Sequence, residues 1–173
     1  GSSDDSVNIL SECPFITLLK YNLNKGKGAA LKVGIENSNN NAIVIFDGDL
    51  ELDPRQIDKL MILNRDENIE CVFGTRFKKR IPTLTIWNIG NLFLTKIFNY
   101  INKSSITDSL CCAKSFYKNK LNFEKLVSKR FDIDVEIASQ LMNTNKKIDE
   151  VILHYSRRNK HQGKKLKMLD GFY

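Results

Sequence analysis

The chain has 173 residues, of which 42% are hydrophobic and 27% charged, and its formal net charge is +7. These values are ordinary for a globular protein, and the length predicts one domain that spans residues 1–173. No apolar run approaches the roughly 18 residues of a membrane-spanning helix and no signal peptide is visible, so we expect a cytoplasmic protein. The four cysteines lack a C-x-x-C spacing, which favours small buried side chains over a metal knuckle.

Helix and strand patterns alternate in the first half of the chain, which predicts an α/β fold with a mostly parallel sheet flanked by helices. The strands are short apolar runs, and the helices carry apolar residues at helical spacing. In chain order the pattern predicts a helix over residues 6–10, a strand over 15–19, a helix over 29–36, a strand over 42–46, an amphipathic helix over 55–64 and a strand over 70–73.

The second half begins with a helix over residues 86–101, which carries apolar residues around much of its circumference. It is either a buried core helix or a helix that lies against a membrane, an acyl chain or a partner. A short strand over residues 115–116, a helix over 134–143 and a last strand over 150–155 complete the predicted elements.

The strand predicted over residues 42–46 ends abruptly in acidic residues. Because the side-chain period of extended backbone is two, Asp47, Asp49 and Glu51 would emerge on one side. Converging carboxylates repel one another unless a cation lies between them, and hard oxygen ligands favour Mg²⁺ or Mn²⁺. Open α/β sheets bind ligands beyond the carboxyl ends of their strands, where these residues lie. The alternative is a solvated acidic loop that leads into a helix.

Two basic residues lie where a phosphate could bind. The glycine-containing segment at residues 25–34 fits neither a dinucleotide fingerprint nor a Walker A loop. It predicts either a simple helix start or a junction whose backbone N–H groups and Lys27 suit a phosphate. Arg76 follows the strand over residues 70–73, and its guanidinium offers a rigid fork for a phosphate or a carboxylate.

Charged residues in the second half have more than one interpretation. Asp108, Asp134 and Glu136 are either surface charge or site acids, and the alternation of acidic and apolar residues over 131–137 favours the second. Six basic residues lie between positions 156 and 168. A local basic segment predicts an anionic partner, which is a phosphate-bearing substrate, a membrane surface or a nucleic acid.

Short motifs follow one another along the chain in an order typical of one enzyme family. They are Asn24-x-Gly26-Lys27-Gly28, Asp47-Gly48-Asp49-Leu50-Glu51, Gly74-Thr75-Arg76-Phe77, Thr107-Asp108 with Lys114, residues 131–136, Tyr155-x-x-Arg158 and Gly163-Lys164-Lys165. In this order they resemble family 2 glycosyltransferases of the GT-A fold, and most of all the dolichyl-phosphate and polyprenyl-phosphate sugar synthases. The family's first strand and its second strand ending in Asp-Asp are absent, so we expect an N-terminally truncated domain whose sheet lacks its first strands.

The resemblance implies transfer of a sugar, with inversion, from a UDP- or GDP-hexose donor whose diphosphate carries Mg²⁺ or Mn²⁺. It also implies a role for each matching residue. The metal ligands would be Asp47, Asp49 and Glu51; the donor-binding residues Lys27, Asp47, Asp49 and Arg76; the acceptor-phosphate residues Lys114, Arg158, Lys164 and Lys165; and the catalytic residues Asp49, Asp108, Asp134 and Glu136.

The acceptor implied by this branch is a polyprenyl phosphate at a membrane surface. Its oxygen is already ionised near neutral pH, so positioning and charge stabilisation suffice. A hydroxyl acceptor would instead need a base, for which Asp108, Asp134 and Glu136 are the candidates. With a polyprenyl phosphate as acceptor, the chain would work at the cytoplasmic face of the membrane. The sequence leaves open whether the chain forms a homo-oligomer.

Two other functions are compatible with parts of the sequence. A nucleotide-sugar pyrophosphorylase also combines an α/β sheet with a carboxylate-bound metal. A basic nucleic-acid-binding module would use residues 156–168, but no base-stacking aromatic residues are interleaved with those charges and the acidic strand end stays unexplained. We therefore expect no nucleic-acid partner.

Overall fold

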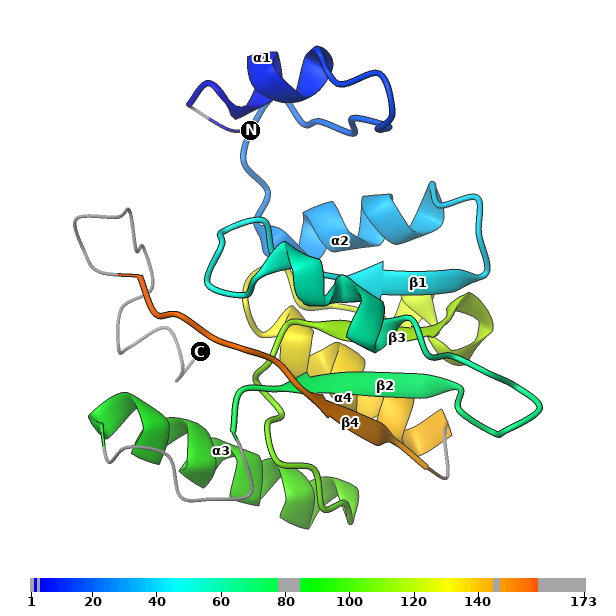
Figure 1. Ribbon diagram of the computed structural model, residues 1–173, viewed down its shortest axis with the longest axis vertical. Coiled ribbons are helices and arrows are strands. Elements are labelled where there is room, and N and C mark those ends of the chain that lie inside the picture. Colours follow the sequence, from blue (N-terminus) through cyan, green and yellow to red (C-terminus); the bar gives the residue numbers. More distant parts are fainter. Residues whose placement is uncertain (1, 3, 78–84, 145–146, 159–173) are drawn as a thin grey trace.

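Four strands form a mixed sheet at the centre of the computed structural model, which describes residues 2, 4–77, 85–144 and 147–158 (Figure 1). The strands β1 (Ala42–Ile45), β2 (Cys71–Thr75), β3 (Lys114–Tyr117) and β4 (Asp149–Ile152) lie in the order β1-β3-β2-β4. β3 is antiparallel to both of its neighbours, whereas β2 and β4 are parallel. β1, β2 and β4 therefore run in the same direction, and their carboxyl ends meet at one edge of the sheet.

The predicted α/β class is confirmed, and the helices flank the sheet as expected. The helices are α1 (Ser6–Ser11), α2 (Lys27–Glu36), α3 (Ile86–Asn102) and α4 (Ile133–Thr144). α4 contacts both α2 and α3 and lies behind the sheet in Figure 1. α1 lies apart from the sheet in the same view, and none of its residues is buried. Adjacent strands in this sheet are less often parallel than the alternation of elements suggested, because β3 inserts between β1 and β2.

Both faces of the sheet are covered, which explains the apolar character of β1 and β2. On one face Ile43 of β1 and Phe73 of β2 pack in a cluster with Ile137 of α4. On the other face Val72 belongs to a second cluster with Leu60, at the end of a 3₁₀ helix over Pro54–Leu60. Successive residues of a strand thus serve opposite clusters, as the period of two requires.

Two predicted elements differ in the structure. The strand expected over residues 15–19 is wrong: these residues form no strand, and the Phe15 side chain is 97% exposed. Strand propensity alone does not make a strand, because the segment pairs with no described strand. The helix expected over residues 55–64 is a shorter 3₁₀ helix over Pro54–Leu60, whose first turn is capped by the carboxylate of Asp53. Two further 3₁₀ helices cover Lys118–Lys120 and Phe123–Lys125.

α3 is apolar on two sides, and only one of them is buried. Thr95 and Phe98 are 4% and 5% exposed, and Phe98 belongs to the same cluster as Phe73 of β2. The helix also presents a stripe of exposed apolar side chains to the solvent. The interpretation as a core helix thus holds for one side of α3, and the contact with a membrane, an acyl chain or a partner stays a prediction for the other. The members of the stripe are Ile89, Phe93, Ile97, Tyr100 and Ile101.

None of the described helices is both long enough and apolar enough to cross a membrane.

Candidate active site

Charged side chains gather where β1, β2 and β4 end. Asp47 and Asp49 follow β1, Arg76 follows β2, and the segment through Arg158 follows β4. This placement fits the general rule that ligands of open α/β sheets bind beyond the carboxyl ends of the strands. Since Lys27 and Asp134 also reach this edge, it holds most of the residues predicted as a donor site.

Lys27 links three elements at this edge. Its ammonium lies 2.9 Å from Asp47 Oδ2 and 2.7 Å from Asp134 Oδ2, near the start of α4. Burial by itself would lower the pKa of Lys27, but attraction to Asp134 and then to Asp47 outweighs burial and raises the pKa above its ordinary value. Lys27 therefore stays charged, and the structure brings together three of the predicted site residues.

The glycines beside Lys27 serve close packing. A Cβ atom on Gly26 would lie 2.2 Å from the carbonyl oxygen of Lys129, and one on Gly28 would lie 2.3 Å from that of Ser128. Gly26 also has a φ of +90°, which disfavours any other residue. The Gly28 N–H donates to the Lys129 carbonyl at 2.9 Å, so the prediction that this junction offers free N–H groups to a phosphate is wrong at Gly28.

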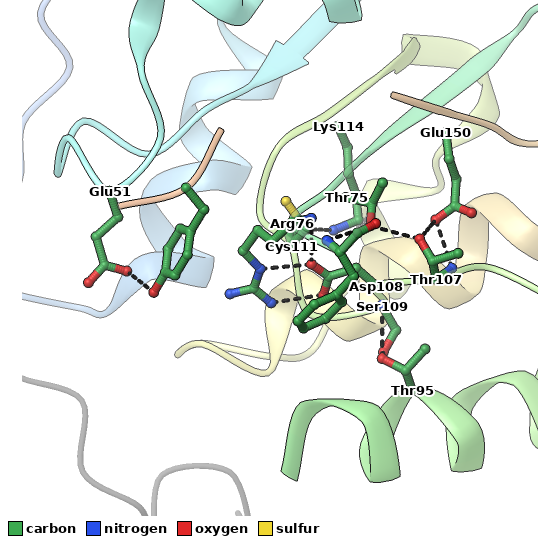
Figure 2. A network of polar contacts seen from close by, with 12 residues as sticks. Glu51, Thr75, Arg76, Thr95, Thr107, Asp108, Ser109, Cys111, Lys114 and Glu150 are labelled. Carbon is green, nitrogen blue, oxygen red and sulfur yellow. Dashed lines mark hydrogen bonds and ion pairs between the residues drawn. The ribbon is translucent and has the colours of Figure 1, made fainter. Parts of the chain in front are cut away.

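The carboxylates of the acidic loop do not converge. Leu50 adopts a φ of +62°, so the backbone turns and the period of an extended strand no longer applies. Asp47 faces Lys27, whereas Asp49 Oδ2 lies 2.7 Å from Arg158 Nη2. Glu51 accepts hydrogen bonds from the Tyr155 hydroxyl at 2.8 Å and from the Arg158 N–H at 3.2 Å, and it lies apart from Arg76 and Asp108 in Figure 2. Asp47 thus has a different partner from the other two acids, whereas Asp49 and Glu51 both contact Arg158.

Arg76 and Asp108 form a buried ion pair (Figure 2). Arg76 Nε and Nη2 donate to the two carboxylate oxygens at 2.7 and 2.8 Å, and the backbone N–H of Arg76 donates at 3.1 Å. The Asp108 side chain is fully buried and that of Arg76 is 17% exposed. Burial alone would lower the pKa of Arg76, but the hydrogen bonds and charge of Asp108 raise it. The fork predicted to hold a ligand is therefore filled by a carboxylate of the same chain.

A second set of polar contacts, which sequence reasoning did not assign, holds the loop that carries Asp108 (Figure 2). The Thr107 hydroxyl lies 2.7 Å from the Thr75 hydroxyl of β2 and 2.9 Å from Glu150 Oε1 of β4. The Thr107 N–H donates to the same carboxylate oxygen at 2.8 Å. Thr107 belongs to one of the motifs noted in the sequence, but only the fold shows that the motif fastens its loop to two strands.

The acceptor-phosphate residues predicted from the resemblance are not gathered at one place. Lys114 is 1% exposed; its ammonium donates to the Cys111 carbonyl and lies 5.3 Å from the centre of the Phe73 ring. A phosphate cannot reach this ammonium as it stands, so the placement argues against the predicted role. Arg158 faces Asp49 instead of open solvent. Lys164 and Lys165 lie outside the described residues.

The three acids considered as bases are all engaged. Asp108 holds Arg76 and Asp134 holds Lys27. The Glu136 carboxylate accepts the N–H groups of residues 127–128, each at 2.9 Å, and so fixes the loop before α4. Glu136 is thus a loop anchor in this structure, which argues against its predicted catalytic role.

A divalent metal fits part of the predicted ligand set. The described residues include no group of three or more His, Cys, Asp or Glu side chains placed to hold a metal ion. A metal that binds with a diphosphate, however, needs only one or two carboxylates from the protein. Asp47 and Asp49 each hold a basic side chain in the structure, which shows that both positions favour a positive charge. These two carboxylates are compatible with a metal, whereas both oxygens of Glu51 are already used by the Tyr155 hydroxyl and the Arg158 N–H.

An α/β sheet with charged side chains beyond its strand ends is typical of a ligand-binding site, and comparison with known proteins identifies the family. The family model described as glycosyl transferase family 2 matches residues 1–123. The chain therefore belongs to glycosyltransferase family 2. The uncharacterized glycosyltransferase YkcC of Bacillus subtilis (strain 168) is 33% identical over 87 residues, which cover 48% of this chain and 27% of that protein.

Solved structures with the same fold are more distant in sequence. Glucosyl-3-phosphoglycerate synthase of Mycobacterium tuberculosis superposes with a TM-score of 0.62 at 19% identity, covering 93% of this chain and 60% of that one. The same enzyme in complex with Mn²⁺, UDP-glucose and glycerol 3-phosphate gives a TM-score of 0.57 at 15% identity and covers 94% and 60%. At this identity the likeness shows the GT-A fold alone. The chain spans less than two thirds of the length of these relatives.

Proposed function

We propose that this chain transfers a hexose from a UDP- or GDP-sugar to the phosphate oxygen of a polyprenyl phosphate, with inversion at the anomeric carbon. The acceptor oxygen forms a bond to that carbon while the bond between the carbon and the donor diphosphate breaks, and the nucleoside diphosphate leaves. Membership in family 2 favours this reaction over a pyrophosphorylase and over a nucleic-acid-binding module.

The engagement of the candidate bases carries this proposal. Asp108, Asp134 and Glu136 each hold a basic side chain or a backbone loop, so deprotonation of an acceptor hydroxyl would require one of them to leave its partner first. A phosphate monoester needs no such base, because its oxygen is already ionised near neutral pH. The arrangement of these acids therefore favours a phosphate acceptor over a hydroxyl acceptor.

On the donor side, Asp47 and Asp49 would hold Mg²⁺ or Mn²⁺, and Lys27 lies beside them. When bound, the metal supplies Lewis-acid neutralisation of the charge on the departing diphosphate. Lys27 is fixed by Asp134, so a partly buried ammonium stands close to the strand ends without reorganisation. Arg76 supports this edge through Asp108.

The site of action follows from the acceptor: we place it at the cytoplasmic face of the membrane, where this chain would bind peripherally. The exposed apolar stripe of α3 supports this placement. Residues 77–107, which leave out the paired Arg76, contain five basic residues and no acidic one, which suits an anionic lipid surface. Replacing Phe93 and Ile97 with Ser should reduce flotation with vesicles that contain an anionic lipid. Unchanged flotation would refute the placement.

Transfer to matched acceptors tests the reaction. The chain with UDP-glucose or GDP-mannose and Mn²⁺ should glycosylate a short-chain polyprenyl phosphate but not the corresponding polyprenol, with the product identified by mass spectrometry. Glycerol 3-phosphate serves as a soluble phosphate acceptor with free hydroxyls. Faster transfer to the polyprenol, or to a hydroxyl of glycerol 3-phosphate, would refute the phosphate-oxygen acceptor.

The metal assignment has its own test. Asp49→Ala should abolish metal-dependent donor binding, measured by calorimetry, while circular dichroism shows an intact fold. If donor affinity withstands both this substitution and EDTA, the metal assignment fails.

A further inference from the structure

The segment that follows β4 is fastened to the acidic loop that follows β1. Tyr155 forms an antiparallel bridge with Leu52, and the Ser156 N–H donates to the Glu51 carbonyl at 2.8 Å. These contacts join residues about a hundred positions apart in the sequence. The backbone up to Arg158 is therefore held beside Asp49 by the chain itself.

The carboxylate of Glu51 completes this attachment. Its Oε2 accepts the Tyr155 hydroxyl at 2.8 Å, and its Oε1 accepts the backbone N–H of Arg158 at 3.2 Å. The Glu51 side chain is 15% exposed. Both of its oxygens are thus used to position Arg158, which is a different role from that of a metal ligand.

The guanidinium of Arg158 is held less completely than its backbone. Nη2 donates to Asp49 Oδ2 at 2.7 Å, but Nε lies 3.7 Å from Glu51 Oε1 and, although buried, has no hydrogen-bond partner in the described residues. Asp49 and Arg158 are 32% and 30% exposed. A guanidinium with an unsatisfied buried N–H gains from a further oxygen ligand, such as that of a phosphate.

We propose that Arg158 is an exchangeable counter-ion: it neutralises Asp49 in the free protein and leaves it when a divalent cation binds there with the donor. Two cations at one carboxylate repel each other, so the guanidinium must turn away as the metal enters. Because Glu51 and Tyr155 keep the backbone in place, only the side chain needs to move. The released fork then faces a phosphate of the bound substrates. This inference rests on the proposed function.

Direct measurement of Mn²⁺ binding tests the exchange without any catalytic step. We would titrate the donor-free chain and follow free Mn²⁺ by electron paramagnetic resonance. Arg158→Gln should tighten Mn²⁺ binding by roughly three- to tenfold, the size expected for removing one partly screened positive neighbour. Arg157→Gln, which removes the same formal charge one position away, is the matched control and should change affinity much less. Arg158→Lys keeps the charge and should bind Mn²⁺ nearly as the unchanged chain does.

The outcomes separate this inference from the function on which it rests. An equal effect of Arg157→Gln and Arg158→Gln would show only a general charge effect and would refute the exchange. So would an Arg158→Gln variant that binds Mn²⁺ no better than the unchanged chain. If no variant binds Mn²⁺, even with UDP present, both the exchange and the metal assignment in the proposed function fail. Circular dichroism melts of each variant confirm that it is folded.

Discussion

Removing the charge of Asp108 should destabilise the whole domain. Its carboxylate is fully buried and accepts three hydrogen bonds from Arg76, at 2.7, 2.8 and 3.1 Å. Asp108→Asn keeps the side-chain volume, so no cavity forms, but it leaves a buried guanidinium without a counter-ion. Breaking a buried pair in this way costs about 3–5 kcal/mol of unfolding free energy. In a chain of this size 1 kcal/mol shifts Tm by roughly 2–4 °C, so a fall of about 6–20 °C is expected.

Urea and thermal unfolding of matched variants measure this effect. Lys147→Ala breaks the ion pair with Asp149, in which the lysine is 61% exposed, and should cost less than about 1 kcal/mol. The double variant Arg76→Met, Asp108→Leu leaves no buried charge and should be more stable than Asp108→Asn alone. A loss below about 1 kcal/mol for Asp108→Asn, or strictly additive single and double variants, would show that the pair contributes little.

Three further measurements follow from the packing and the pKa values. Gly28→Ala places a Cβ atom 2.3 Å from a backbone carbonyl oxygen and should destabilise the fold. Gly34→Ala places its Cβ atom where no other atom lies within 4 Å, so it should stabilise α2 by about 0.5–1 kcal/mol. Chemical denaturation of the two variants distinguishes these effects. Burial and the hydrogen bond to Glu51 raise the pKa of Tyr155 to about 12. Its contribution to stability is therefore complete below the ordinary tyrosine pKa of about 10 and is lost as the pH rises through about 12. Tyr155→Phe should flatten this alkaline loss of stability, and an unchanged pH profile would contradict the role of Tyr155. The exposed Cys13 should react rapidly with a thiol reagent. Burial raises the pKa of Cys71 to about 12 and should protect its thiol from the reagent until the chain unfolds. Mass spectrometry of the labelled protein checks both expectations.

The sequence predicts well those features that depend on neighbouring residues. The apolar run of β1 and its switch to acidic residues are local, so the strand and the position of Asp47 and Asp49 could be predicted. The same holds for α4, where apolar residues repeat at helical spacing and pack in the core. The local pattern was misleading over residues 15–19, because a strand also needs a partner strand, and none of the described strands pairs with this segment.

Pairings between distant residues could not be predicted. Asp49 and Arg158 lie 109 positions apart, and Arg76 and Asp108 lie 32 apart, so no sequence window contains both members of either pair. The turn at Leu50 was equally hidden, because a non-glycine residue rarely adopts a positive φ. The sequence therefore identified charged residues of the site, but the fold decides which charges neutralise one another.

The ion pairs within the free site affect how a metal and a nucleotide can bind to it. Lys27, Arg76 and Arg158 are each paired with a carboxylate, so the described residues of the free site offer few uncompensated charges to a diphosphate. A metal ion alone must displace Arg158 or Lys27, and a donor alone must compete with the carboxylates for the same basic residues. A metal that enters with a diphosphate brings compensating charges and disturbs this balance least. Metal and nucleotide should therefore each increase the affinity of the other by the same factor, as linkage requires.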